Sequence, residues 1–374
     1  MKSVRVSGQE CFVVDGADVS VAVTRRGGHM APVTFFAGSD HPIQPYHISP
    51  WQTEDTAIDV PVLRPLRGDF FCLPFGANAA PLTAHGESAT EPWAPVGIVS
   101  DGRVVTMALR VDTQHPVGTV EKDISLVDGD SAVYVRHTIT GNHGRTSLGH
   151  HATLGVHNGP LSIATGPIRF GYTNPYGAGV TADREYYSLA SGARFSSLRD
   201  VPTIWKDPDR TDCSVFPARE GFVDILQVFQ KPTDDPGWVA AACAESGYLW
   251  YALKDMTVLP STVFWMENRG RHASPWNGRN ACIGLEDVCG LFADGLPASA
   301  APNLLTELGV PTFQTLSGDA PFVVSYIEGV VRIPDRFDAV ASARFADRTV
   351  TFVSESGIEV TATVRHDFVR GAAL

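Results

Sequence analysis

The 374-residue sequence lacks an excess of positive charge. Its 41 acidic residues outnumber the 29 lysines and arginines, which gives a formal net charge of −12. A protein that binds nucleic acid needs a basic surface to neutralise phosphates, and this composition supplies no such electrostatic footprint. We therefore expect no nucleic-acid partner.

Long apolar stretches are also missing. The sequence has no run of about 18 apolar residues, the length that a membrane-spanning helix requires. The N-terminal residues, MKSVRVSGQECFVVDG, contain no continuous apolar core of the kind that a signal peptide has. These two absences predict a cytoplasmic protein with no membrane partner.

Cysteine is scarce and dispersed. None of the six cysteines belongs to a C-x-x-C pair, so neither a zinc site nor a disulfide framework is indicated. We expect reduced thiols that behave as small buried apolar side chains: Cys11, Cys72, Cys213, Cys243, Cys282 and Cys289.

Glycine and proline are abundant, whereas charged residues are few. The chain has 35 glycines and 26 prolines, and only 19% of its residues are charged. This mixture is typical of many short strands joined by turns. Because large β-sandwiches often remain undivided, we predict an all-β fold in a single domain over residues 1–374.

Alternation of apolar and polar residues supports strands from end to end of the chain. It is clear at Val19, Val21 and Val23, again over residues 133–139, and in two C-terminal segments, 350–352 and 358–364. Between the last two segments, residues 354–357 (SESG) predict a hairpin connection.

One short helix is expected over residues 302–308. Pro302 suits a first helical turn and Gly309 can end the helix. One face would carry three leucines: Leu304, Leu305 and Leu308. The Pro- and Ala-rich stretch before it, residues 295–302, is interpreted as a loop.

Several motifs in the first quarter of the chain resemble a known superfamily. Residues 19–29 (VSVAVTRRGGH) suit a strand and a glycine turn, and residues 67–76 (RGDFFCLPFG) are followed by His85, Gly86 and Trp93. In this order they resemble the aldose 1-epimerase (galactose mutarotase) superfamily, and most closely the hexose-6-phosphate mutarotase branch. The resemblance implies that Arg67 and His85 bind sugar hydroxyls.

Later motifs continue the resemblance in the same order. Residues 133–144 lead into residues 149–155 (GHHATLG), which are similar to the superfamily's strand, turn and catalytic histidine. Aligning Leu154 with a phenylalanine of the superfamily pattern places that histidine at His151. Residues 264–270 and 281–286 resemble the late strands, and Glu286 stands where the catalytic glutamate is expected.

The resemblance implies a β-supersandwich of the galactose mutarotase type that interconverts sugar anomers. Ring opening requires one group to take the proton of the anomeric hydroxyl and another to protonate the ring oxygen, and a carboxylate and an imidazole suit this work. We expect Glu286 as base and His151 as acid, a small-molecule sugar as partner, and no metal or organic cofactor. Trp93 and Trp265 are candidates to stack on the sugar ring.

The site assignment leaves alternatives open. His150 and His151 are adjacent, so on a strand they point to opposite faces and only one can line a given cleft. His150 is therefore kept as a second substrate-binding candidate, and Asp224 is the candidate for the superfamily's acidic sugar-binding residue. A metal site at His150, His151 and His157 is not expected, because the spacing matches no zinc signature.

The function also has alternatives. The pocket residues depart from the superfamily pattern at Asp69, Phe70, residues 87–90 and residues 154–155, which is compatible with a non-catalytic carbohydrate-binding protein. A polysaccharide lyase or glycoside hydrolase is a third reading, because one architecture serves several activities. The sugar and its phosphorylation stay open, as does a homodimer. Basic candidates for phosphate contact are Arg25, Arg26, Arg269, Arg271 and Arg279.

Overall fold

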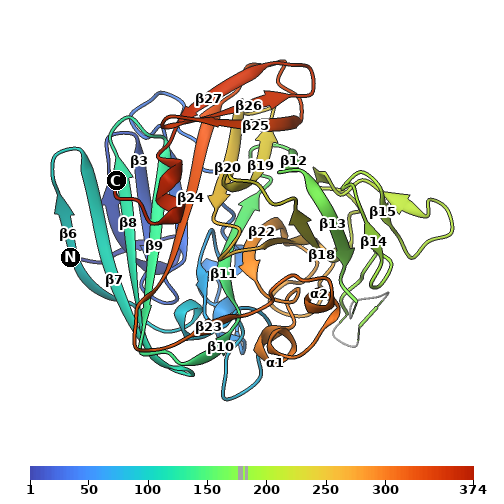
Figure 1. Ribbon diagram of the computed structural model, residues 1–374, viewed down its shortest axis with the longest axis horizontal. Helices are drawn as coiled ribbons and strands as arrows, with labels where there is room; N and C mark the ends of the chain where they lie inside the picture. Colours follow the sequence, from blue (N-terminus) through green and yellow to red (C-terminus); the bar gives the residue numbers. More distant parts are fainter. Residues whose placement is uncertain (176–179, 182–183) are drawn as a thin grey trace.

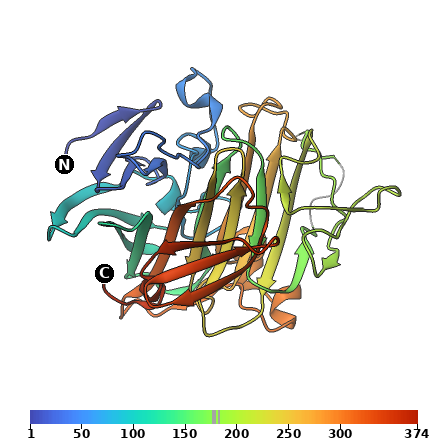
Figure 2. The ribbon, with the colours of Figure 1, turned by 90° about the horizontal axis from the view of Figure 1, so that it is seen from above.

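The computed structural model of the chain describes residues 1–175, 180–181 and 184–374. Its framework consists of two large antiparallel sheets that face each other (Figures 1 and 2). The main apolar core lies between these sheets and combines Val135 of one with Leu285 of the other, both fully buried. This arrangement confirms the predicted all-β class.

The larger sheet has nine strands in the order β17-β12-β19-β20-β24-β9-β8-β7-β6. Their bounds are β6 Ala94–Ser100, β7 Val104–Gln114, β8 Val117–Val127, β9 Ala132–Thr140, β12 Leu161–Thr165, β17 Val215–Phe216, β19 Gly237–Cys243, β20 Tyr248–Lys254 and β24 Phe322–Arg332. The alternation predicted over residues 133–139 falls in β9, where Val135, His137 and Ile139 are buried and the intervening residues are half-buried.

The second sheet has seven strands in the order β14-β13-β18-β21-β22-β11-β5. Their bounds are β5 Phe71–Cys72, β11 Leu148–Gly155, β13 Ile168–Thr173, β14 Arg194–Phe195, β18 Phe222–Gln230, β21 Ser261–Asn268 and β22 Ala281–Cys289. Both faces of β11, β21 and β22 are covered, because nearly every residue in these strands is buried. One face meets the nine-stranded sheet, which leaves the opposite face of these central strands to build a site under the loops.

Smaller sheets extend the framework at its periphery. A four-stranded N-terminal sheet lies at one end of the molecule, and the β13–β15 region lies at the other (Figures 1 and 2). The strands of the N-terminal sheet are β1 Val4–Val6, β2 Gln9–Asp15, β3 Val19–Thr24 and β4 Met30–Phe35. The predicted alternating valines lie in β3. Two-stranded pairs are formed by β10 Gly144–Thr146 with β23 Gln314–Leu316, and by β15 Val201–Pro202 with β16 Arg210–Thr211.

The C-terminal hairpin is confirmed. Strands β26 (Thr349–Ser354) and β27 (Glu359–Thr363) pair antiparallel, and β25 (Val340–Ala346) completes a three-stranded sheet. Gly357 adopts a φ of 84° in the connecting turn, a conformation that glycine reaches without a steric penalty. Val350 and Phe352 of β26 pack on the outer face of the nine-stranded sheet.

The helix prediction needs two corrections. The expected helix is shorter, α2 (Leu304–Glu307), and it begins after Asn303, whose side-chain oxygen accepts hydrogen bonds from the backbone N–H of Leu305 and Thr306. Asn303 forms the cap because its amide oxygen can accept from the first turn, whereas Pro302 lies outside the helix. The stretch interpreted as a loop contains a second short helix, α1 (Gly295–Ala300).

Short 3-10 turns complete the described part of the chain: η1 Pro50–Thr53, η2 Pro61–Leu63, η3 Glu87–Ala89 and η4 His366–Arg370. None of the described helices is long and apolar enough to cross a membrane. The segment that contains η1 and η2 covers one end of the seven-stranded sheet's outer face.

Candidate active site

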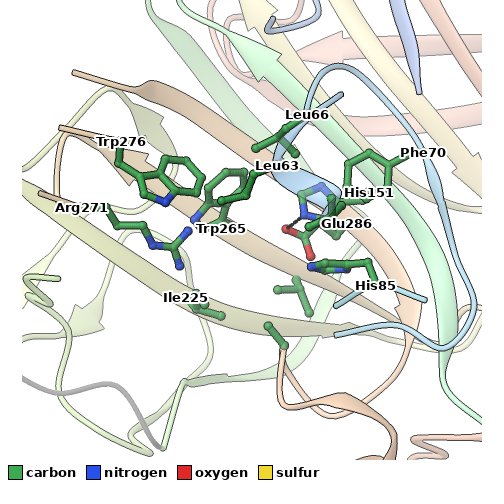
Figure 3. A pocket seen from close by; sticks show the side chains of 13 residues that line it. Leu63, Leu66, Phe70, His85, His151, Ile225, Trp265, Arg271, Trp276 and Glu286 are labelled. Atoms are coloured by element: carbon green, nitrogen blue, oxygen red, sulfur yellow. Dashed lines mark ion pairs between the residues drawn. The ribbon is translucent and has the colours of Figure 1, made fainter. Parts of the chain in front are cut away.

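The centre of the candidate site is a pair of side chains on neighbouring strands. In the antiparallel register of β11 and β22, His151 lies directly opposite Glu286. Residues opposite each other in such a pair project to the same face of the sheet. The His151 Nε2 and Glu286 Oε1 atoms are accordingly 3.2 Å apart (Figure 3).

The adjacent residue His150 points to the other face, as strand geometry requires. Its Nδ1 lies 2.8 Å from Asp69 Oδ2, and its ring stacks on Tyr326 with centroids 4.1 Å apart. His150 therefore lies in the core between the two large sheets. Of the two candidate histidines, His151 is the one that faces the cavity.

A cavity of about 90 Å³ opens beside the His151–Glu286 pair. Four of its lining residues are polar: His85, His151, Arg271 and Glu286. The others are apolar: Val62, Leu63, Leu66, Phe70, Ile225, Val263, Trp265, Trp276 and Ala293. Such a mainly apolar lining with a few convergent polar groups is typical of a small-molecule site.

His85 reaches the cavity from a tight turn. The residue has a φ of 60°, and Gly86 follows with a φ of 78°. A Cβ atom on Gly86 would lie 1.9 Å from the carbonyl oxygen of Leu73, so only glycine fits there. The turn places the His85 ring 5.0 Å from that of His151, centroid to centroid, with Cys72 Sγ 3.4 Å from its Nδ1. Gly86 thus permits the tight turn that places His85 in the cavity lining.

An arginine lies at the opposite end of the cavity from His85 (Figure 3). The guanidinium of Arg271 is 4.9 Å from the ring centroid of Trp276 and 5.4 Å from that of Trp265, which favours cation–π attraction. Its Nε donates a hydrogen bond of 2.7 Å to Glu185 Oε1, and Glu267 Oε2 lies 3.7 Å away.

Burial perturbs both members of the central pair. It raises the pKa of Glu286 well above its usual value, and the opposing charge of Arg271 only partly offsets this effect. Burial also lowers the pKa of His151 well below 6.5, and His85 contributes in the same direction. Both shifts disfavour the ion pair and favour a protonated carboxyl beside a neutral imidazole.

Thr153 contacts Nδ1 of His151, the ring nitrogen that is turned away from the carboxyl. Its Oγ1 lies 3.2 Å from His151 Nδ1 and donates toward the His151 carbonyl oxygen at 3.5 Å. With the hydroxyl proton directed to that carbonyl, Oγ1 can accept from Nδ1–H, which leaves the lone pair of Nε2 facing Glu286. The pair can therefore give a proton from one member and accept a proton at the other.

Two further groups have shifted pKa values: His85, which lines the cavity, and Glu267, which contacts Arg271. Burial lowers the pKa of His85 to about 4, with a smaller contribution from Arg271, so this imidazole is neutral at pH 7. Burial raises the pKa of Glu267, beside Arg271, to about 7. Within the described ranges, no group of three or more His, Cys, Asp or Glu residues is arranged to hold a metal ion.

Arg67, predicted as a sugar contact, does not line the cavity. It is fully buried, and its guanidinium donates hydrogen bonds to Gln52 Oε1 and to the carbonyl oxygens of Val6, Ser7, Ala31 and Pro65. These contacts fasten the N-terminal strands to the segment that precedes β5. The side chain serves the fold, and its donors are not turned toward the cavity.

Trp93 and Asp224 also lie outside the cavity. The indole N–H of Trp93 donates to the Ser88 carbonyl oxygen at 2.9 Å within the core. Asp224 accepts hydrogen bonds from the backbone N–H groups of Ser188 and Leu189. It projects away from the cavity because its neighbour on β18, Ile225, projects into it.

The structure thus brings four predicted residues together: His85, His151, Trp265 and Glu286. Trp276 and the apolar residues of η2 were not predicted, because no motif marks them. Arg271 appeared in the sequence only as one of several basic residues without a position. Its location directly after the predicted strand 264–270 was the one available signal.

Comparisons with known proteins agree with this architecture. No protein-family model and no curated protein sequence matches the chain. Solved structures do match. A candidate mutarotase from Salmonella typhimurium superposes with a TM-score of 0.55 at 13% identity, covering 88% of this chain and 93% of that one. A candidate aldose 1-epimerase from Escherichia coli K12 gives 0.55 at 11% identity, covering 86% and 99%.

A third match is a galactose mutarotase related enzyme from Lactobacillus acidophilus. Its TM-score is 0.52 at 10% identity, over 87% of this chain and 98% of that one. The chain therefore has the galactose mutarotase-like fold, as its sequence motifs predicted. At these identities the comparisons show a shared fold.

Proposed function

We propose that the protein is an aldose 1-epimerase-like enzyme that interconverts the anomers of a sugar. The observation that carries this proposal is the His151–Glu286 pair, with 3.2 Å between Nε2 and Oε1, at the wall of a cavity in a galactose mutarotase-like fold. Mutarotation needs two acid/base groups that act on the two oxygens bonded to C1, the anomeric hydroxyl oxygen and the ring oxygen. This pair can supply both groups.

The pKa shifts support a division of labour opposite to the one expected from the sequence. Glu286 carries the proton at rest and delivers it to the ring oxygen, while Nε2 of His151 takes the proton of the anomeric hydroxyl. The bond between C1 and the ring oxygen breaks, and C1 becomes an aldehyde carbon. After rotation about C1–C2, both protons return and the ring closes on the other face. No net proton is gained or lost.

The test is anomer exchange measured by NMR on a panel of free sugars. Glu286→Gln and His151→Asn should each lower the exchange rate by about 10²–10⁴-fold, the usual contribution of a general acid or base. Matched controls are Glu220→Gln and His115→Asn, whose side chains are 69% and 45% exposed. Both controls should keep wild-type rates.

Two results would count against the enzyme. If wild-type protein never exceeds the buffer-catalysed rate on any sugar, the proposed activity is excluded. If both site variants keep full activity, the acid/base role of His151 and Glu286 is excluded. Saturable sugar binding without exchange would instead identify the non-catalytic carbohydrate-binding alternative.

A further inference from the structure

Arg271 is placed to contact the part of a sugar farthest from the reacting carbon. It lies at the end of the cavity opposite His85 and the His151–Glu286 pair, and its terminal nitrogens are turned toward the cavity (Figure 3). Its guanidinium plane is held by Trp265 and Trp276. With C1 at the acid/base pair, the far side of a bound ring would meet this guanidinium.

The charge of Arg271 is already balanced by the protein. Glu185 accepts its Nε–H at 2.7 Å, and Glu267 lies 3.7 Å away on the same side. The Tyr187 hydroxyl donates to the second oxygen of Glu185 at 2.7 Å, which fixes the carboxylate in place. Arg271 is the only lysine or arginine among the described residues that line the cavity. The local charge is therefore not positive.

We propose that Arg271 selects an uncharged sugar by donating from its terminal nitrogens to neighbouring hydroxyls at the end of the ring away from C1. This inference rests on the proposed function and adds the class of substrate. The planar fork of an arginine matches a pair of adjacent oxygens, and it makes charge-assisted hydrogen bonds to neutral acceptors.

A phosphate or carboxylate gains little at this position. An anion needs cations that are not compensated by the protein, whereas the Glu185 carboxylate pairs with this guanidinium, Glu267 lies 3.7 Å from it, and the whole chain carries a net charge of −12. A phosphorylated hexose, the substrate class suggested by the branch resemblance, is therefore disfavoured. Arg271 takes the sugar-binding role that the sequence motif assigned to Arg67.

The experiment compares matched sugars on the intact chain. Anomer exchange is measured by NMR for glucose against glucose 6-phosphate, and for galactose against galacturonate. We expect kcat/KM to be at least about tenfold higher for the neutral member of each pair. A wild-type preference for the phosphate or the uronate would overturn the inference while leaving the proposed function intact.

Variants test the residue itself. Arg271→Met should raise KM for the neutral sugar by roughly 10- to 100-fold, because hydrogen bonds from a charged donor are lost, and Arg271→Lys should restore part of it. Glu185→Gln uncovers the arginine charge, so the preference for neutral over anionic sugar should fall by about tenfold. An unchanged preference in a folded Glu185→Gln protein would contradict the charge balance.

The two proposals fail in different ways. If no sugar in the panel is exchanged by wild-type protein, the proposed function fails, and the inference fails with it. If neutral sugars are exchanged but Arg271→Met leaves KM unchanged, the inference alone fails. Glu267→Gln provides a second means of changing the charge should Glu185→Gln not fold, and thermal unfolding establishes which variants are folded.

Discussion

A buried ion pair between Lys254 and Asp287 lies on the face of β22 opposite to Glu286. The two side chains are 1% and 0% exposed, with Nζ 2.5 Å from Asp287 Oδ1. Nζ also donates to the Ser261 carbonyl oxygen and to Thr262 Oγ1, both at 2.8 Å, so all three of its protons have acceptors. Asp287 follows Glu286 on β22 and points to the opposite face.

Replacing Lys254 by methionine leaves the Asp287 carboxylate buried with only two neutral donors. These are the hydroxyls of Thr262, at 2.6 Å, and Tyr326, at 2.9 Å. Leaving one charge of a buried pair uncompensated costs about 3–5 kcal/mol, so Lys254→Met should lower the free energy of unfolding by that amount. Asp287→Asn should have a similar effect, because it strands the ammonium instead.

The double variant Lys254→Met/Asp287→Asn removes both charges. It should be no less stable than either single variant, which corresponds to a coupling energy of at least about 3–5 kcal/mol, the cost of one single substitution. The assay is urea unfolding followed by tryptophan fluorescence at pH 7. Because Asp287 does not face the cavity, the double variant should still exchange anomers.

A matched control is the exposed pair Arg344–Glu359, with 2.7 Å between Nη2 and Oε2 and side chains 59% and 51% exposed. Arg344→Met should cost less than about 1 kcal/mol, because water screens and replaces such a contact. If Lys254→Met is no more costly than Arg344→Met, or if the two buried substitutions are simply additive, the reasoning is refuted.

Three further predictions concern protonation and exposure. Thr153→Val removes the hydroxyl that contacts Nδ1 of His151, so kcat should fall about tenfold and the pH profile of kcat should shift, while KM stays the same. An unchanged pH profile would contradict a role of Thr153 in setting the His151 tautomer. Burial raises the pKa of Glu267 from 4.5 to about 7, so the stabilising contribution of its protonated form is complete below pH 4.5 and is lost as the pH rises through 7. Wild-type protein should therefore lose about 3 kcal/mol relative to Glu267→Gln between pH 4.5 and 8 in urea unfolding, and a constant difference would argue against this titration. All six cysteines are buried, so thiol reagents should label the folded protein slowly and the unfolded protein at six sites; rapid labelling at pH 7 would be inconsistent with this packing.

The proximity of His151 and Glu286 follows the superfamily motifs, and strand geometry accounts for the face on which each side chain lies. Alternation along a strand fixes the face of each residue, and the buried strand before Glu286 indicated where its carboxyl would be delivered. The position of Arg271, the arginine proposed to bind the sugar, was not predictable in this way. An arginine in a loop can contact a ligand or satisfy backbone carbonyls, and only the packing of the N-terminal strands shows that Arg67 does the latter.

The segment that covers the cavity, residues 51–66, and Arg271 both contact Trp276. Because these contacts form only in the folded chain, no single sequence motif could reveal either part of the site. Trp51 donates from its indole N–H to the Leu63 carbonyl oxygen at 2.7 Å, and its ring packs edge-on against Trp276 with centroids 4.9 Å apart. The Arg271 guanidinium lies over the same Trp276. The segment that covers the cavity and the residue proposed to select the sugar thus meet on one indole, and they come from two distant parts of the chain, residues 51–66 and 271–276. A change in the packing of Trp276 therefore acts on access to the cavity and on sugar selection at once.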